Sequence, residues 1–412
     1  MGFISSYVVY LVAFLGLYIQ VFFFVIFLEK RKELSTKKDK PTIFPSLGII
    51  IPCWNEEATV SKTILSLLDL EYPKDKLKIF VVDDGSTDNT FSAMKVFESN
   101  PQVQIYTKEN GGKHGALNYA LARMDTELVS SIDADTILEK DALQHVVKFF
   151  EDKKDAVAVG CTVLIGSPKT FIQKAQSIEY QMFSFSKKML GLIGGVLVAP
   201  GAFSVFKRKV LNEVGGWKHG HSLEDLELTY RIQTSGYKAD HCHTAIAHTK
   251  GPESLKQLFK QRLRWGFGFL KNTSDYSSTF FNRKLGNFGI FTVPMSVIAY
   301  FAVMFIFFYS WERIGAFFYD KIITFNTVGW DNLFMADFNM SWFFVNTQAI
   351  SFISVLLLGS LALTIFLGRH ISDVNKKPHH ILWYFIVFSF LQPLWVLKSV
   401  YNYFFTKAVA WR

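Results

Sequence analysis

Four long segments without a charged residue constrain the fold of this 412-residue chain more than any other feature. They run from residue 1 to 28, from 285 to 311, from 338 to 368 and from 381 to 397. A helix of about 20 apolar residues crosses the hydrocarbon core of a bilayer, so the longer segments can span it with some tilt. In the last segment Gln392 and Pro393 interrupt the apolar run, and burial among neighbouring helices would satisfy the freed backbone groups. We therefore expect four transmembrane helices, one at residues 1–28 and three in a membrane domain at 285–405.

The residues that flank these segments predict the topology. Residues 1–28 lack a basic start and a small-residue cleavage site, which favours a spanning helix over a signal peptide. The sequence EKRKELSTKKDK follows with six Lys or Arg and three acids, so residues 29–45 are expected to be a basic linker in the cytoplasm. The basic loop at 368–380 is expected on the same side and a short loop at 318–337 outside. The N-terminus is then outside, and residues 29–284 are cytoplasmic.

Residues 46–282 form a different region, in which short apolar strands alternate with helical patterns. The expected strands are LGIIIPC, KLKIFVVDD, VQIYTK, ELVSSIDAD and AVAVGCT. The expected helices between them are ATVSKTILSLLDL, TFSAMKVFESN, KHGALNYALARM and DALQHVVKFFED. Strands separated by helices of this length predict βαβ units and a parallel sheet covered on both faces. Ligands of such sheets bind beyond the carboxyl ends of the strands.

Acidic residues cluster at three of these strand ends. Asp83 and Asp84 end one strand, Asp133 and Asp135 end another, and Asn-Glu-Glu at 55–57 follows a third. Asp83 and Asp84 fit a tight turn into a capped helix, but a turn needs only one aspartate. The second carboxylate can accept a hydrogen bond from a base N–H or a ribose hydroxyl. The segment therefore also fits a nucleotide contact.

Asp133 and Asp135 stand one residue apart on a bend between strand and loop. Two such carboxylates can face one hard cation, which takes oxygen ligands and shares them with a diphosphate. The alternative is an exposed loop whose acids help to cap the next helix. Gly-Gly-Lys-His-Gly at 111–115 opens a helix, so its backbone N–H groups and Lys113 suit a phosphate.

The sequence Ser-Leu-Glu-Asp at 222–225 has two interpretations. Ser222 and Asp225 are spaced as in a capping box, and acids are favourable in the first turn of a helix. A carboxylate at a helix start that faces a cleft can also be the general base for a sugar hydroxyl. The nearby His219 and His221 could orient that base, although surface histidines are the simpler explanation.

The sequence Gln-Arg-Leu-Arg-Trp at 261–265 lies between the acidic region and the C-terminal apolar segments. On a helix Gln261, Arg264 and Trp265 fall at i, i+3 and i+4, so their side chains share one face. An indole stacks on a sugar ring, and a guanidinium forks onto phosphate oxygens. The alternative is an amphipathic helix at the membrane surface with Trp and Arg at the headgroups.

The amino-acid composition indicates a membrane protein and limits the partners that are needed to explain its charge. Half of the chain is hydrophobic and 42 residues are Phe. The net charge of +9 is explained by topology and by anionic headgroups of the lipid bilayer, so no nucleic acid is needed as a partner. Few ionisable residues lie in the spans, which disfavours an ion-coupled transporter. Cys53, Cys161 and Cys242 are isolated and are expected to be buried in a reducing compartment, and His241, His243 and His248 fit no common metal spacing.

The motifs DDGST, DAD, LED and QRLRW, in this order, resemble the processive family 2 glycosyltransferases, which include cellulose, chitin and hyaluronan synthases. The resemblance covers about residues 46–270 and the membrane layout after them. It implies an α/β fold, a GT-A-like, Rossmann-type mixed sheet domain inserted between transmembrane helices. With a single N-terminal span, the chain looks most like the bacterial poly-β-1,6-N-acetylglucosamine synthases of the biofilm-matrix type.

Carried over motif by motif, the resemblance implies a role for each matching residue. Asp83 and Asp84 would hold the uridine, and Asp133 would support the ribose and diphosphate with Lys113 beside it. Asp135 would bind Mg²⁺ or Mn²⁺. Asp225 would be the catalytic base. The acceptor end and the diphosphate would be held by Gln261, Arg264 and Trp265.

Two departures from the family pattern affect the acceptor side. Leu223 replaces the common Thr in the motif of the base, and this leaves Asp225 in register. The Phe-Phe-Cys-Gly-Ser sequence of cellulose synthases is absent, and Val-Ala-Pro-Gly-Ala-Phe at 198–203 occupies that region. The acceptor is therefore expected to fit differently.

The resemblance also implies the reaction and its partners. UDP-N-acetylglucosamine would be the donor, a growing β-1,6-linked polysaccharide the acceptor and product, and a small membrane subunit a partner. Catalysis and export of the exopolysaccharide would share one protein of the bacterial cell membrane. The alternative is an enzyme of the same fold that transfers one sugar to a polyprenyl phosphate, which would not need QRLRW.

Overall fold

The computed structural model describes residues 2–34, 40–328, 349–372, 374 and 380–406. Residues 35–39 of the expected basic linker and residues 338–348 of the expected third span lie outside the described residues. The chain divides into two compact units, Met1–Val25 with Ser296–Thr364 and Ile26–Met295 with Ile365–Arg412. The second unit holds all of the motifs described above.

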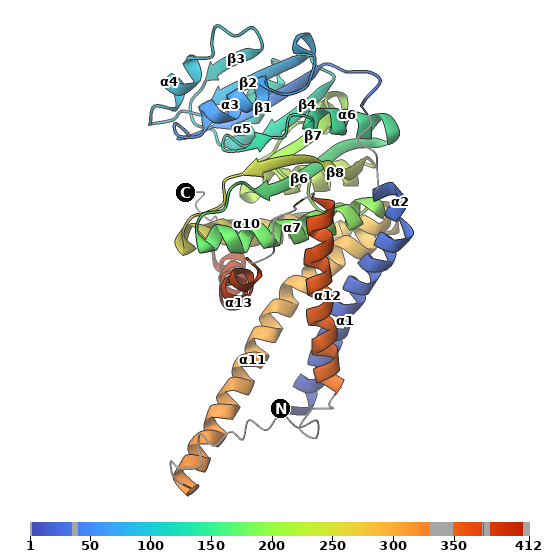
Figure 1. Ribbon diagram of the computed structural model, residues 1–412, viewed down its shortest axis with the longest axis vertical. Coiled ribbons are helices and arrows are strands. Elements are labelled where there is room, and N and C mark those ends of the chain that lie inside the picture. Colours follow the sequence, from blue (N-terminus) through green and yellow to red (C-terminus); the bar gives the residue numbers. More distant parts are fainter. Residues whose placement is uncertain (1, 35–39, 329–348, 373, 375–379, 407–412) are drawn as a thin grey trace. The chain divides into compact units, whose positions relative to one another are not determined.

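One eight-stranded sheet is the centre of the second unit (Figure 1). Its strands are β1 (Leu47–Cys53), β2 (Leu77–Asp83), β3 (Val103–Thr107), β4 (Leu128–Ile132), β5 (Ile137–Leu138), β6 (Ala156–Ile165), β7 (Phe203–Lys207) and β8 (Lys238–Thr249). Their order is β3-β2-β1-β4-β7-β6-β8-β5. β1 to β4 are mutually parallel where they pair, whereas β7 is antiparallel to both β4 and β6. The expectation of a mixed sheet is confirmed, and a purely parallel one is wrong.

Helices and short helical turns precede, connect and follow the strands in this unit. Before β6 they are α2 (Arg31–Leu34), α3 (Val60–Leu68), η1 (Lys74–Lys76), α4 (Thr90–Lys95), α5 (Lys113–Leu121) and α6 (Ala142–Asp152). After β6 they are α7 (Phe171–Leu192), α8 (Arg208–Glu213), η2 (Gly220–Ser222), α9 (Glu224–Thr234), α10 (Leu255–Asp275), η3 (Ser277–Thr279), η4 (Arg283–Leu285) and the π-helical η5 (Phe288–Thr292).

Both faces of the sheet are covered. Successive side chains of a strand point to opposite faces, so Ile49 and Ile51 of β1 lie in one hydrophobic core and Ile50 lies in the other. The first core includes α3 and α6, and the second includes α5 and α9. The near-continuous apolar sequence of the central strands follows from this burial on two sides.

Capping boxes begin the two long helices that carry or support the QRLRW motif. At the start of α7 the Thr170 hydroxyl accepts from the Gln173 backbone N–H, and the Gln173 side chain accepts from Thr170. Ser254 and Gln257 do the same for α10. The capping box expected at Ser222 is not formed, because α9 begins one residue later than that pattern needs and Leu223 is its N-cap. Asp225 therefore does not close a capping box with Ser222.

Four described helices are long and apolar enough to cross a membrane. They are α1 (Gly2–Glu29), α11 (Val293–Val328), α12 (Ala349–Ile371) and α13 (Ile381–Phe405). The loop expected at 318–337 is wrong for residues 318–328, which continue α11, and its remainder lies outside the described residues. Charged residues 312 and 313 ended the apolar run in the sequence, but charge does not break a helix as Pro does.

Candidate active site

The carboxyl ends of β1 and β2 hold the first group of predicted residues. Asp83 is paired with the last residue of β1, and its carboxylate accepts from the backbone N–H of Ser86 at 3.2 Å and from the Thr107 hydroxyl at 3.1 Å. The Asp84 carboxylate accepts from the backbone N–H of Gly111 at 3.0 Å and pairs with Lys108 at 2.7 Å. Both aspartates are buried. Their orientation is therefore fixed by the turn that follows β2 and by the loop that follows β3.

Lys113 links the end of β4 to the start of α9. Its Nζ lies 2.6 Å from an Asp133 oxygen and 2.8 Å from a Glu224 oxygen. Burial alone would lower the pKa of Lys113, but Asp133, Glu224 and Asp225 together hold it above its ordinary value. An ammonium that bridges two carboxylates in this way stays charged. It joins the DAD and LED motifs, which are about 90 residues apart in the sequence, in one cluster.

Asp225 lies in the first turn of α9 with both carboxylate oxygens engaged. One oxygen accepts from the backbone N–H of Gly201 and the other from that of Leu226, each at 2.8 Å. Burial, and then the neighbouring Glu224, raise the pKa of Asp225, whereas Lys113 opposes the rise. A carboxylate with a raised pKa holds a proton more readily than an ordinary aspartate, which suits a general base.

Gly201 packs directly against this cluster. A methyl group at its Cα would stand 2.8 Å from the Lys113 ammonium, 3.4 Å from an Asp225 oxygen and 3.5 Å from a Glu224 oxygen. Only a residue without a side chain leaves these groups undisturbed. Gly201 lies in the Val-Ala-Pro-Gly-Ala-Phe segment, so this segment holds Asp225 through a backbone N–H and packs against Lys113 without a side chain.

Asp135 lies in a crowded group of carboxylates. Its oxygen accepts from the Thr249 hydroxyl at 3.2 Å. Burial, and then the charges of Asp133 and Glu56, raise the pKa of Asp135 to about 7. Mutual repulsion of this kind is relieved by a cation, so the donor set fits a divalent ion that also binds substrate oxygens. Within the described ranges, no group of three or more His, Cys, Asp or Glu side chains is arranged so that it could hold a metal ion by itself.

The three predicted residues of QRLRW lie in the middle of α10 and make different contacts. The Gln261 amide oxygen accepts from Gln176 of α7 at 3.2 Å. Arg264 donates to the backbone carbonyl of Ser222 at 3.0 Å, three residues before Asp225. Trp265 is half-buried. α10 thus packs beside the segment that leads into the predicted base.

The histidines and cysteines outside this cluster have structural surroundings. His221 pairs with Asp275 at 2.7 Å, and the His219 ring contacts that of His114. His241, Cys242 and His243 lie in β8. All three cysteines are free and buried, as the sequence predicted.

Several residues of this region were not predicted from the sequence. They are Gly201, Glu224, Gln176, Glu179 and Arg262. One signal was available in the sequence of α7, because the polar residues Gln173, Gln176 and Glu179 recur every third residue, and the structure shows that all three are buried. Polar residues on the buried face of a helix need partners, so the pattern indicates a second polar helix against α7.

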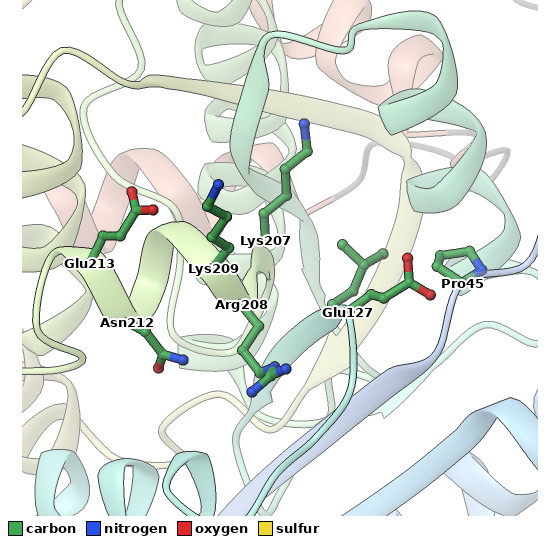
Figure 2. A pocket seen from close by; sticks show the side chains of 8 residues that line it. Pro45, Glu127, Lys207, Arg208, Lys209, Asn212 and Glu213 are labelled. Carbon is green, nitrogen blue, oxygen red and sulfur yellow. The ribbon is translucent and has the colours of Figure 1, made fainter.

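An open cavity of about 690 Å³ lies elsewhere in this unit (Figure 2). Its lining residues are Pro45, Glu127, Leu128, Lys207, Arg208, Lys209, Asn212 and Glu213. Leu128 begins β4 and Asp133 follows the end of that strand, so the cavity is at the opposite edge of the sheet from the carboxylates. It is not part of the carboxylate cluster.

Comparison with known proteins identifies the family. The family described as glycosyltransferase like family 2 matches residues 45–268, which is more than half of the chain. The chain belongs to this family. The matched range contains all of the motifs, from the first strand to QRLRW.

Curated relatives and a solved structure extend the comparison. The chain is 30% identical over 243 residues to poly-beta-1,6-N-acetyl-D-glucosamine synthase of Staphylococcus aureus, and 29% identical over 250 residues to that of Staphylococcus epidermidis. The matches cover 58% and 60% of each chain, so the chain spans less than two thirds of these relatives. A mannosyltransferase from Pyrobaculum calidifontis, solved with GDP-Man and Mn²⁺, has a TM-score of 0.58 at 17% identity and covers 96% of this chain and 99% of its own. It shows the fold.

Proposed function

We propose that this protein is a membrane-embedded, inverting and processive glycosyltransferase. It polymerises N-acetylglucosamine from UDP-N-acetylglucosamine into a β-1,6-linked exopolysaccharide for the biofilm matrix and helps to export it. The observation that carries the proposal is the bridge from Asp133 through Lys113 to Glu224, beside Asp225. It joins a carboxylate group suited to a nucleotide diphosphate to a carboxylate suited to deprotonate a hydroxyl. The choice of sugar rests on the staphylococcal relatives.

The donor is bound at the edge formed by β2 and β4. Asp83 and Asp84 hold the uridine, because their positions are fixed by backbone donors before the nucleotide arrives. Asp133 and Lys113 contact the ribose and diphosphate. A divalent cation, Mg²⁺ or Mn²⁺, bound through Asp135 would neutralise charge on the diphosphate as it leaves.

The transfer is a single displacement. The Asp225 carboxylate takes the proton from an acceptor hydroxyl while that oxygen attacks the anomeric carbon of the donor. The bond from this carbon to the diphosphate breaks, UDP leaves with the electron pair, and the configuration at the carbon inverts. The Gly201 N–H holds the base in place, and Lys113 keeps a positive charge between donor and acceptor sides.

The acceptor end is held by α10. Trp265 stacks on the terminal sugar, Gln261 contacts it, and Arg264 contacts the diphosphate. Four helices that can span a membrane fit a route by which the growing chain leaves the site. In this proposal residues 29–284 are cytoplasmic, residues 285–405 are the membrane domain, and a small membrane subunit assists.

The proposal is tested by turnover in purified membranes. Membranes with the wild-type chain and with Asp225→Asn are incubated with UDP-N-acetylglucosamine, UDP-glucose or UDP-galactose, and the products are sized and their linkages determined. We expect a β-1,6-linked N-acetylglucosamine polymer from the wild type and none from the variant. A different donor or linkage would refute the proposed substrate. A single sugar on a polyprenyl phosphate would refute a processive synthase.

A further inference from the structure

Arg262, the second residue of QRLRW, is the most buried charged residue of α10. Only 5% of its surface is exposed, and its guanidinium forms an ion pair with Glu179 of α7. The same guanidinium lies over the indole of Trp265, 4.3 Å from the ring centroid. Phe388 of α13 lies 5.6 Å from it on another side. Three helices therefore meet at one buried cation.

Burying such an ion pair is costly and is a poor way to stabilise a helix contact. Both charges lose their hydration when they are buried, and apolar residues of similar size stabilise such a contact as well or better. Among the residues that the structure describes, the Nε of Arg262 also has no hydrogen-bond partner. Stability therefore does not explain the ion pair of Arg262 and Glu179. The contact of the planar Arg262 guanidinium with the Trp265 indole offers another explanation.

A row of contacts fixes α10 and the loop before it against α7. Gln173 donates to the Gly251 carbonyl at 3.0 Å, Gln176 donates to Gln261 at 3.2 Å, and Glu179 pairs with Arg262. These α7 residues are three apart, so they lie along one face of that helix. Together they fix how far α10 is rotated about its own axis, which decides where Trp265 points.

We propose that Glu179 and Arg262 are positioning residues that hold the Trp265 indole in one orientation for the acceptor sugar. Glu179 fixes the guanidinium, and the guanidinium covers one face of the indole. A sugar then stacks on the opposite face. The identity of the ligand rests on the proposed function, whereas the orientation of the ring does not.

The orientation of the Trp265 ring can be tested separately from the identity of its ligand, by a measurement that needs no enzymatic turnover. The protein is labelled with 5-fluorotryptophan, and the ¹⁹F resonance of Trp265 is assigned as the one lost in Trp265→Phe. We expect one narrow resonance in the wild type and a shifted, broadened or split one in Glu179→Gln and Arg262→Gln. Arg262→Lys keeps a charge for Glu179 but lacks the planar group, so its resonance should also change while the protein folds normally.

A matched control separates positioning from general damage. Arg208 donates to the backbone carbonyls of Thr126 and Met124 at the opposite edge of the sheet, where it lines the cavity of Figure 2. Arg208→Gln therefore removes an arginine that holds backbone without contacting Trp265. We expect it to leave the Trp265 resonance unchanged. An unchanged resonance in Arg262→Lys and Glu179→Gln, or the same change in Arg208→Gln, would overturn the proposal.

The acceptor part is tested by product length at equal amounts of folded protein. We expect Arg262→Lys and Glu179→Gln to shorten the polymer about two- to fivefold, the lower end of the range for a cation–π contact, with UDP affinity unchanged. Altered ¹⁹F resonances with normal product length would overturn the acceptor role alone. Absence of any polymer from the wild type would defeat the proposed function, and the ¹⁹F result would still decide whether Arg262 positions Trp265.

Discussion

The donor edge and the acceptor side of this active site are built in different ways. At the donor edge Asp83 ends strand β2 and Asp84 follows it, and backbone N–H groups of nearby loops bind both carboxylates, that of Ser86 for Asp83 and that of Gly111 for Asp84. On the acceptor side the contacts join helices distant in sequence, such as Arg264 with Ser222 and Arg262 with Glu179. Under the proposed function, donor binding therefore depends on local chain geometry, whereas acceptor binding depends on how α7, α9 and α10 pack. The two functions should therefore be separable by mutation.

The largest separation is expected for Asp225→Asn. Loss of the general base should lower the rate about 10²–10⁴-fold, while UDP affinity stays unchanged because the donor contacts lie on other elements. The measurement is initial rate together with UDP binding by calorimetry. Asp152→Asn, at an exposed ion pair with Lys148, is the control. A variant that keeps the wild-type rate, or that loses UDP binding, would contradict the assignment.

A loss confined to the donor edge is expected for Asp135→Ala. Without a carboxylate for the cation, charge on the departing diphosphate is not neutralised, and the rate should fall about 100-fold or more. Excess chelator should do the same to the wild type, and added Mg²⁺ or Mn²⁺ should restore it. Full polymer synthesis by the wild type in excess chelator would contradict a role for a divalent cation in the reaction.

The reaction rate and the stability of the fold should depend on pH in opposite ways. The pKa of Asp225 is raised by burial and then by Glu224, so this base is protonated at higher pH than an ordinary aspartate. The rate at saturating cation should fall about tenfold per pH unit once the pH drops below that pKa. The stability of the fold changes in the opposite direction. Because the pKa of Asp225 is higher in the folded chain than in the unfolded chain, its buried carboxylate lowers the free energy of unfolding at pH values above the unfolded pKa. This cost disappears as the pH falls.

Thermal unfolding of the wild type and of Asp225→Asn checks the stability part. Since the variant never carries the buried charge, it should unfold at a higher temperature than the wild type at pH 8, and the gap should narrow towards pH 4. A variant that is less stable at both pH values would show that the carboxylate contributes more through its hydrogen bonds than it costs as a buried charge.

A smaller effect is expected for Gly201→Ala. The added methyl group would stand 2.8 Å from the Lys113 ammonium, so the ammonium must move and its pairs with Asp133 and Glu224 change. We expect kcat to fall about tenfold, as for small misplacements of catalytic groups, with little change in unfolding temperature. Gly315→Ala, whose methyl group would have no atom of the described residues within 4 Å, is the control. Equal kcat in Gly201→Ala and wild type would show that this spacing is unimportant.

The donor edge was accessible to sequence reasoning because strand alternation and turn residues are local. The sequence of β1 predicted its bounds, and the acids after β2 and β4 marked the edge of the sheet. Local patterns could not predict the antiparallel β7 or the N–H of Gly201 at Asp225, since both depend on a long return of the chain. They also gave a false capping box at Ser222, where a turn with positive φ displaces the start of α9. The sequence does not mark Arg262 as a site residue, because its partner Glu179 lies in α7 and comes near it only in the folded chain.

The most direct test of the account is the length of the product made by wild type and Trp265→Ala from labelled UDP-N-acetylglucosamine, at equal amounts of folded enzyme. Loss of the stacking surface, worth about 1–2 kcal/mol when desolvated, should shorten the polymer several-fold and leave UDP affinity unchanged. Arg264→Ala should shorten it and also weaken UDP binding, because a guanidinium contact with the diphosphate is lost. Equal lengths in wild type and Trp265→Ala would contradict the claim that α10 holds the growing chain.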